Sequence, residues 1–145
     1  AQQVTKTVHK KAVKTDVVTT GTMTIRKPDY ICISTDNDRD LLMMDATKFT
    51  ITIGGKRHTT DSRNNPQFTT FHDVLTAVIN GQPIPQTDDM TITTKGGQKT
   101  ITITPVGKKR QLFTSFVLTL DTKTSAIVHL RMNARGEDYI NYDFK

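Results

Sequence analysis

The chain has 145 residues, 34% of them hydrophobic, with a single cysteine and a formal net charge of +6. This length suffices for one domain, residues 1–145, whose core needs neither a metal nor a disulfide. No run approaches the ~18–20 apolar residues of a membrane-spanning helix. The single Cys32 cannot form an internal disulfide and completes no metal or redox motif.

Much of the positive charge lies in two clusters: Lys6, Lys10, Lys11 and Lys14, and Lys108, Lys109 and Arg110. Such clusters attract nucleic acid, anionic lipid headgroups or acidic proteins. Exposed lysines also keep strands soluble and sheet edges unpaired, and we favour this interpretation. Nucleic-acid binding is disfavoured further because the chain has no tryptophan and only 6% aromatic residues to stack on bases.

Alternation of apolar residues with threonine, the residue of roughly one position in five, predicts half-buried strands along most of the chain. The first run, residues 4–8, is expected to point Lys6 outward. The later runs place these residues on one face each: Met23 and Ile25; Phe49, Ile51 and Ile53; Ile101 and Ile103; Phe116, Leu118 and Leu120; Val128, Leu130 and Met132; Ile140, Tyr142 and Phe144. The pairs Gly54-Gly55 and Gly96-Gly97 predict tight hairpins. We therefore expect an antiparallel meander of eight to ten strands.

One segment departs from this alternation. Apolar residues recur at helical spacing over residues 66–80, in the set Phe68, Phe71, Val74, Leu75, Val78 and Ile79. Asn65 is a suitable N-cap with Pro66 at the first helical position, and Gly81 suits the residue after the C-cap. Pro83 and Pro85 prevent the helix from continuing. A helix of about 21 Å cannot cover a sheet about 38 Å wide. Either the strands curl and fill their own interior, or a concave apolar space remains under a partial lid.

No catalytic or metal-binding constellation is recognisable. The four histidines, His9, His58, His72 and His129, have no metal-ligand spacing. No nucleophile motif or glycine-rich phosphate loop is present. The alternating Asp36, Asp38 and Asp40 lack the glycine and distal glutamate of a calcium loop, and they are interpreted as a polar turn. The sequence predicts a binding protein without a cofactor, not an enzyme.

Four segments resemble strands of the LolA-type periplasmic lipoprotein carriers, in the same order and at similar spacing. They are GTMTIRKPDYI at 21–31, LLMMDATKF at 41–49, TITP at 102–105 with FVLTLD at 116–121, and GEDYINYDF at 136–144. Lys27 stands where that family has an arginine before proline. Ile33 stands in place of a tryptophan, Asp45-Ala46 in place of Asp-Gly, and the usual N-terminal helix has no counterpart.

The resemblance implies a mainly β (α+β) fold: an unclosed antiparallel half-barrel with a helical lid over a concave apolar face. It also implies a non-enzymatic carrier for a lipoprotein acyl chain or similar amphipathic ligand in the Gram-negative periplasm. A chain that starts without methionine agrees with export and signal cleavage. The expected cavity residues are Met23, Ile25, Ile33, Phe49, Ile51, Ile53, Ile101, Ile103, Phe116, Leu118, Leu120, Leu130 and Met132. The expected lid is Phe68, Phe71, Val74, Leu75, Val78 and Ile79, with Lys27 as a possible latch.

The alternative is an envelope protein-protein interaction module that uses the same scaffold without lipid transport. Its basic edge, Lys108, Lys109 and Arg110, would dock an envelope protein or an anionic surface, and salt would weaken the association. If the concave face is tightly packed in the ligand-free protein, a carrier that holds its ligand there is ruled out.

Overall fold

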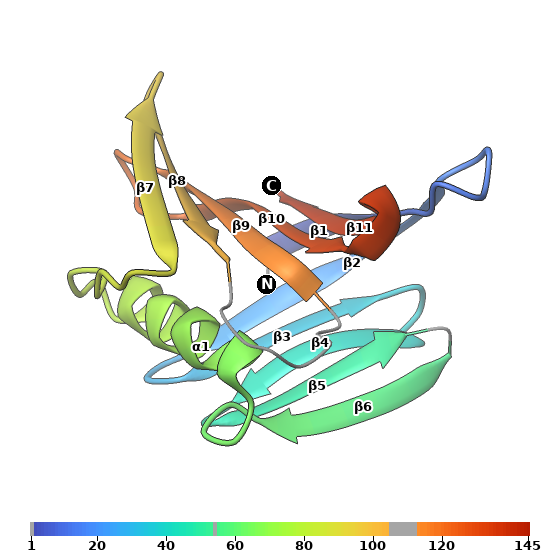
Figure 1. Cartoon of the computed structure of the whole chain (residues 1–145), viewed down its shortest axis with the longest axis horizontal. Helices are drawn as coiled ribbons and strands as arrows, with labels where there is room; N and C mark the ends of the chain where they lie inside the picture. Colours follow the sequence, from blue (N-terminus) through green and yellow to red (C-terminus); the bar gives the residue numbers. More distant parts are fainter. Residues whose placement is uncertain (1, 54, 105–112) are drawn as a thin grey trace.

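The computed structural model describes residues 2–53, 55–104 and 113–145, and these residues form eleven strands, one α-helix and one short 3-10 helix (Figure 1). The elements in chain order are β1 (Gln2–His9), β2 (Val17–Arg26), β3 (Tyr30–Thr35), β4 (Asp40–Asp45), β5 (Lys48–Ile53), β6 (Lys56–Asp61), α1 (Pro66–Ile79), β7 (Met90–Lys95), β8 (Gln98–Ile103), β9 (Phe113–Asp121), β10 (Ile127–Ala134), η1 (Arg135–Glu137) and β11 (Tyr139–Phe144). The mainly β class is confirmed, and the expected eight to ten strands are too few.

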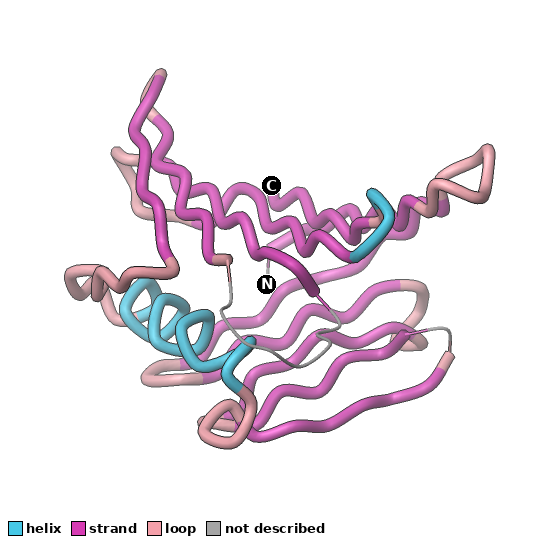
Figure 2. Tube along the Cα trace, in the orientation of Figure 1, coloured by secondary structure: helices cyan, strands magenta, loops and turns pink. Residues whose placement is uncertain are grey.

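All the strands belong to one antiparallel sheet with the order β6-β5-β4-β3-β2-β1-β11-β10-β9-β8-β7. β1 pairs with β2 on one side and with β11 on the other, so the first and last strands lie side by side at its centre. β6 and β7 are its two edges, and no described pairing closes the sheet. The sheet curls so that β3 to β6 form one wall and β7 to β11 the other, as Figure 2 shows. α1 lies along the open side between the walls.

The tight turns follow from residues that accept positive φ. Gly96 and Gly97 have φ of 59° and 78°, the combination of the hairpin turn whose twist matches its strands. They join β7 to β8 at the pair Lys95 and Gln98. Ala46 has φ of 54° in the turn between β4 and β5, where the related sequence pattern has glycine. A residue with a Cβ is strained in this conformation.

The helix begins and ends as its sequence predicts. Pro66 occupies the first turn, where the missing N–H costs no helical hydrogen bond. At the other end Gly81 has φ of 64°. The N–H of Gln82 donates to the Ala77 carbonyl at 2.9 Å and that of Gly81 donates to the Val78 carbonyl at 3.3 Å. These two bonds form a Schellman motif and terminate the helix. Within the described residues, no helix has the length and apolarity needed to cross a membrane.

The alternation assigns the inner face correctly in most strands, and three residues differ from expectation. Lys6 is only 4% exposed and shares the inner face with Val4, so the expected outward orientation is wrong. Ile25 shares the inner face with Met23 but is 41% exposed, because it lies near the end of β2. In β10 Val128 is expected on the inner face with Leu130, but an irregularity in pairing between Ile127 and His129 buries Ile127 and leaves Val128 only partly buried.

Candidate functional site

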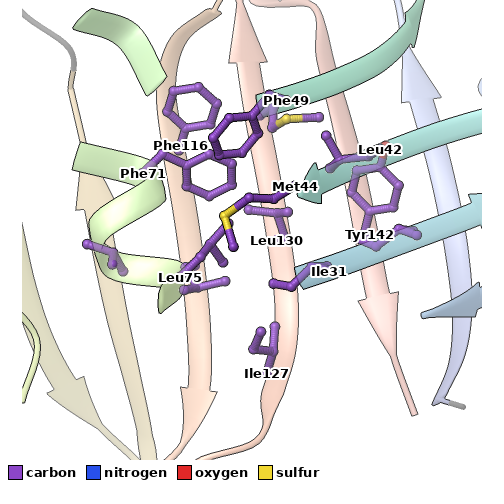
Figure 3. Packing of buried hydrophobic residues seen from close by; sticks show 14 of the residues in the cluster. Ile31, Leu42, Met44, Phe49, Phe71, Leu75, Phe116, Ile127, Leu130 and Tyr142 are labelled. Carbon is purple, nitrogen blue, oxygen red and sulfur yellow. The ribbon is translucent and has the colours of Figure 1, made fainter. Parts of the chain in front are cut away.

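The interior is built from aromatic and aliphatic side chains of both walls and of α1. Phe71 of α1 lies between Phe49 of β5 and Phe116 of β9, with ring centroids 5.7 Å and 4.4 Å away (Figure 3). Both pairs are stacked, and Phe71 and Phe116 are fully buried. α1 therefore joins the two walls through its apolar face, as the helical spacing predicts.

This interior is filled. The cavity enclosed by Met44, Phe49, Phe71, Leu75, Leu130 and their neighbours has a volume of about 20 Å³. A site for a small organic ligand usually needs about 300–1,000 Å³. The sequence left two alternatives open: strands that curl and fill their own interior, or a concave space under a partial lid. This conformation matches the first. The expected open concave space is absent from the described part of the chain, so this conformation does not fit a carrier that holds its ligand on the concave face.

The structure brings most of the expected cavity and lid residues together as this packed core. Buried from the cavity set are Met23, Ile33, Phe49, Ile51, Ile101, Ile103, Phe116, Leu118, Leu120, Leu130 and Met132. The expected lid residues Phe68, Phe71, Val74, Leu75 and Ile79 are buried as well, and Val78 is partly buried against them. Ile25 is 41% exposed and is not part of the packed core, and the side chain of Ile53 lies outside the described part of the structure. That any of these residues contact a ligand stays a prediction.

A larger hollow lies at the C-terminal end of α1. This groove has a volume of about 360 Å³ and lies between the last turn of α1, the segment 81–86, β7, β8 and the end of β9. Its apolar lining comes from Ala77, Val78, Ile84, Ile92 and Leu120, and its polar lining from Gln82, Gln86, Lys99 and Ser125. Val78, Ile84 and Ile92 pack against the core. The groove is thus an opening at the margin of the interior and has ligand-site dimensions.

Lys99 places a charge in this groove. It pairs with Leu120 across β8 and β9, so its side chain emerges on the inner face of the sheet. No carboxylate of the described residues forms an ion pair with it, and it is only half-exposed. The sequence could have predicted this position. Lys99 lies two residues before Ile101 in QKTITI, so both side chains are on the same face of the strand.

A second polar feature on the inner face was missed by the sequence reading. The Lys6 ammonium lies 3.5 Å from an Asp40 carboxylate oxygen and 5.9 Å from the centroid of the Tyr142 ring. Burial of the Tyr142 hydroxyl, together with the negative charge of Asp40, raises the pKa of that phenol. The ion pair compensates a lysine that would otherwise be costly to bury.

The polar attachments of α1 differ from the expected latch. Lys27 is exposed and forms no ion pair with a described residue. The Asn80 side-chain amide, just beyond the helix, donates to the Pro28 carbonyl at 2.8 Å, one residue from Lys27. Thr70 donates to Asp89 at 2.9 Å on the side of β7. The helix is thus tied to both walls, but not through Lys27.

A further carboxylate, Asp61, supports the segment that enters α1. The Arg63 guanidinium donates to Asp61 at 2.8 Å, and these hydrogen bonds hold the pKa of the carboxyl well below its usual range. The arrangement has a structural role. Among the described residues no group of three or more histidine, cysteine or carboxylate side chains is suitable for a metal ion. The basic run Lys108, Lys109 and Arg110 lies outside the described residues, so its docking role stays a prediction.

No family model and no curated protein sequence matches this chain. A structure comparison finds a LolA superfamily protein from Nitrosomonas europaea at 5% sequence identity and a TM-score of 0.36. The match covers 99% of this chain and 82% of that protein.

Proposed function

We propose that the protein is a non-enzymatic carrier that binds an amphipathic, acyl-bearing ligand, such as the acyl chain of a lipoprotein, in the groove at the end of α1. The groove supports this proposal because it combines an apolar wall continuous with the core and a single unpaired lysine at ligand-site dimensions. The acyl chain contacts Val78, Ile92 and Leu120. Each buried methylene contributes about 0.8 kcal/mol.

The polar rim determines which end of the ligand remains near water. The Lys99 ammonium is suited to a carboxylate or phosphate headgroup, since a charged hydrogen bond to an anion is stronger than a neutral one. Gln82, Gln86 and Ser125 offer amide and hydroxyl groups to the remaining polar atoms. The proposed ligand is therefore anionic at one end and aliphatic at the other.

A longer acyl chain requires more room than the groove provides, and the interior is the adjoining apolar region. Its wall toward the groove is α1, which contacts the sheet mainly through Phe68, Phe71, Val74 and Leu75. An acyl chain in place of α1 would make apolar contacts with the same face of the sheet. Displacement of α1 therefore exchanges one apolar partner for another at the cost of bonds such as Asn80 to Pro28. In this proposal α1 acts as the lid. The periplasmic setting is part of the proposal and rests on the sequence resemblance.

Binding is tested by titrating the protein with a fluorescent fatty acid and displacing it with lauric acid. Ile92→Asp places a charge on the apolar wall and is expected to weaken binding at least tenfold, about 1.4 kcal/mol. Thr93→Asp is the matched control, since Thr93 is the next residue of β7 and is exposed on the other face. Lys99→Gln is expected to weaken binding of the fatty acid but not of its methyl ester. Equal affinities for Ile92→Asp and Thr93→Asp would contradict the proposal.

A further inference from the structure

The projecting end of the hairpin of β1 and β2, residues 10–18, carries three of the four large hydrophobic side chains that are exposed among the described residues. Val13, Val17 and Val18 are 50%, 59% and 58% exposed. The pairing of β2 with β3 begins at Gly21, so the preceding residues of β2 extend beyond that neighbour. The hairpin therefore projects from the body of the molecule (Figure 1).

The apolar surface of this hairpin is not confined to one face. Val17 pairs with Val8 and shares the inner face, whereas Val18 pairs with Thr7 and lies on the outer face. Val13 lies in the connection between the strands. A protein partner, or a second copy of this chain, that packs on the sheet would cover only one of these two faces. Valines on both faces and at the tip suit a medium that surrounds the hairpin, such as the interfacial layer of a bilayer.

The charges beside the valines are of both signs, and two exposed lysines among them are available to an anionic surface. The Lys11 ammonium lies 3.1 Å from a Glu137 carboxylate oxygen and its backbone N–H donates to Asp138 at 2.8 Å, while the His9 ring is hydrogen-bonded to Asp16 at 2.7 Å. Lys10 and Lys14 are exposed and form no ion pair with a described residue. Their aliphatic stems can lie along apolar surface while their ammonium groups contact lipid phosphates.

We propose that this hairpin docks the protein on an anionic lipid bilayer, with Val13, Val17 and Val18 inserted at headgroup depth and Lys10 and Lys14 on lipid phosphates. The C-terminal end of α1 and β7 lie at the opposite side of the molecule (Figure 1). Docking in this orientation leaves the groove open to water. The inference does not depend on the proposed ligand, because it rests on a different set of residues.

The absence of tryptophan from the sequence provides a direct probe. Val17→Trp places one tryptophan on the hairpin, and Ile25→Trp places one on the same face of the same strand at its other end. Vesicles of phosphatidylcholine with phosphatidylglycerol are expected to shift the emission of Val17→Trp to shorter wavelength, and brominated lipid is expected to quench it. Ile25→Trp is expected to change little. Vesicles of phosphatidylcholine alone, or high salt, should weaken the response.

Sedimentation with the same vesicles separates the contributions. Replacing Val13, Val17 and Val18 together by serine is expected to lower vesicle affinity at least about tenfold. Lys10→Gln with Lys14→Gln should also lower it, whereas Lys95→Gln with Lys123→Gln, at exposed lysines elsewhere, should not. Circular dichroism establishes that each variant is folded. Unchanged emission of Val17→Trp, vesicle binding retained by the valine variant, or dimers that this variant abolishes would overturn the proposal.

Discussion

Two positions on the inner face of β2, Val17 and Met23, follow the same alternation and have opposite environments. Met23 lies on the inner face under the core and is 2% exposed, whereas Val17 lies on the same face and is 59% exposed. Near Met23 the two walls and α1 bring Phe49, Phe71 and Leu75 together. The strand segment at Val17 projects beyond β3. The comparison shows that alternation determines which face a side chain occupies, while the elements packed on that face determine whether it is buried.

The largest expected effect on stability is in the packed interior near Met23. Phe71→Ala removes the ring that joins both walls, and we expect the free energy of unfolding to fall by about 3–5 kcal/mol. Urea denaturation followed by circular dichroism measures this change. Phe144→Ala, at a buried phenylalanine outside this stack, is a useful comparison. A loss of less than about 1 kcal/mol for Phe71→Ala would mean that α1 does not hold the walls together.

The next effect concerns the buried ion pair between these two regions. Asp40→Asn leaves the Lys6 ammonium without its carboxylate, and we expect a loss of about 2 kcal/mol, since Asp40 is partly exposed. Lys6→Met combined with Asp40→Asn should recover most of that loss, because no unpaired charge is then buried. Equilibrium urea denaturation of the two variants measures the difference. If the double variant were as unstable as Asp40→Asn, Lys6 would not be buried as described.

The free energy of unfolding is expected to fall at alkaline pH because of Tyr142. Burial and the Asp40 charge raise the pKa of Tyr142 in the folded state, so folding favours the neutral phenol. This contribution is complete below the unfolded pKa, and it is lost as the pH rises above about 10. Tyr142→Phe should reduce the loss of unfolding free energy between about pH 9 and 11, measured by urea denaturation at each pH. Tyr30→Phe serves as the control, and an identical profile for both variants would contradict the account.

The smallest expected effect on stability is at Val17, in the projecting part of the hairpin. Val17→Ser is expected to change the free energy of unfolding by at most about 0.5 kcal/mol, because the side chain is exposed already. Met23→Ser, on the same face of the same strand, should cost about 3 kcal/mol or more. The same urea denaturation measures both. A large loss for Val17→Ser would show that another part of the chain covers the hairpin.

Much of this fold follows from sequence patterns. The helix bounds could be predicted because Pro66 and Gly81 act locally, and the hairpin of β7 and β8 because Gly96-Gly97 accepts positive φ. The inner positions Phe49 and Ile51 of β5, Ile101 and Ile103 of β8, and Phe116, Leu118 and Leu120 of β9 could be predicted because apolar residues stand there at every second position. Local patterns do not contain the curvature of the sheet, which decides whether the interior is open or filled.

The errors have the same origin. A lysine is expected to face water, but the spacing of Lys6 from Val4 places it on the inner face, and its partner Asp40 is distant in sequence. The exposure of Ile25 depends on where the covering elements end. The groove also combines Val78, Ile92 and Leu120 from three separate segments. Such sites become visible only when the pairing of the strands is known.

Native mass spectrometry of freshly purified protein, with organic extraction of any bound material, tests the carrier proposal most directly. We expect an additional mass that extraction releases as an anionic acyl lipid, or, in protein first stripped of lipid, uptake of one added lauric acid. Ile92→Asp should lose this mass and Thr93→Asp should keep it. Protein that is empty when isolated and that also takes up no lauric acid would contradict the carrier function.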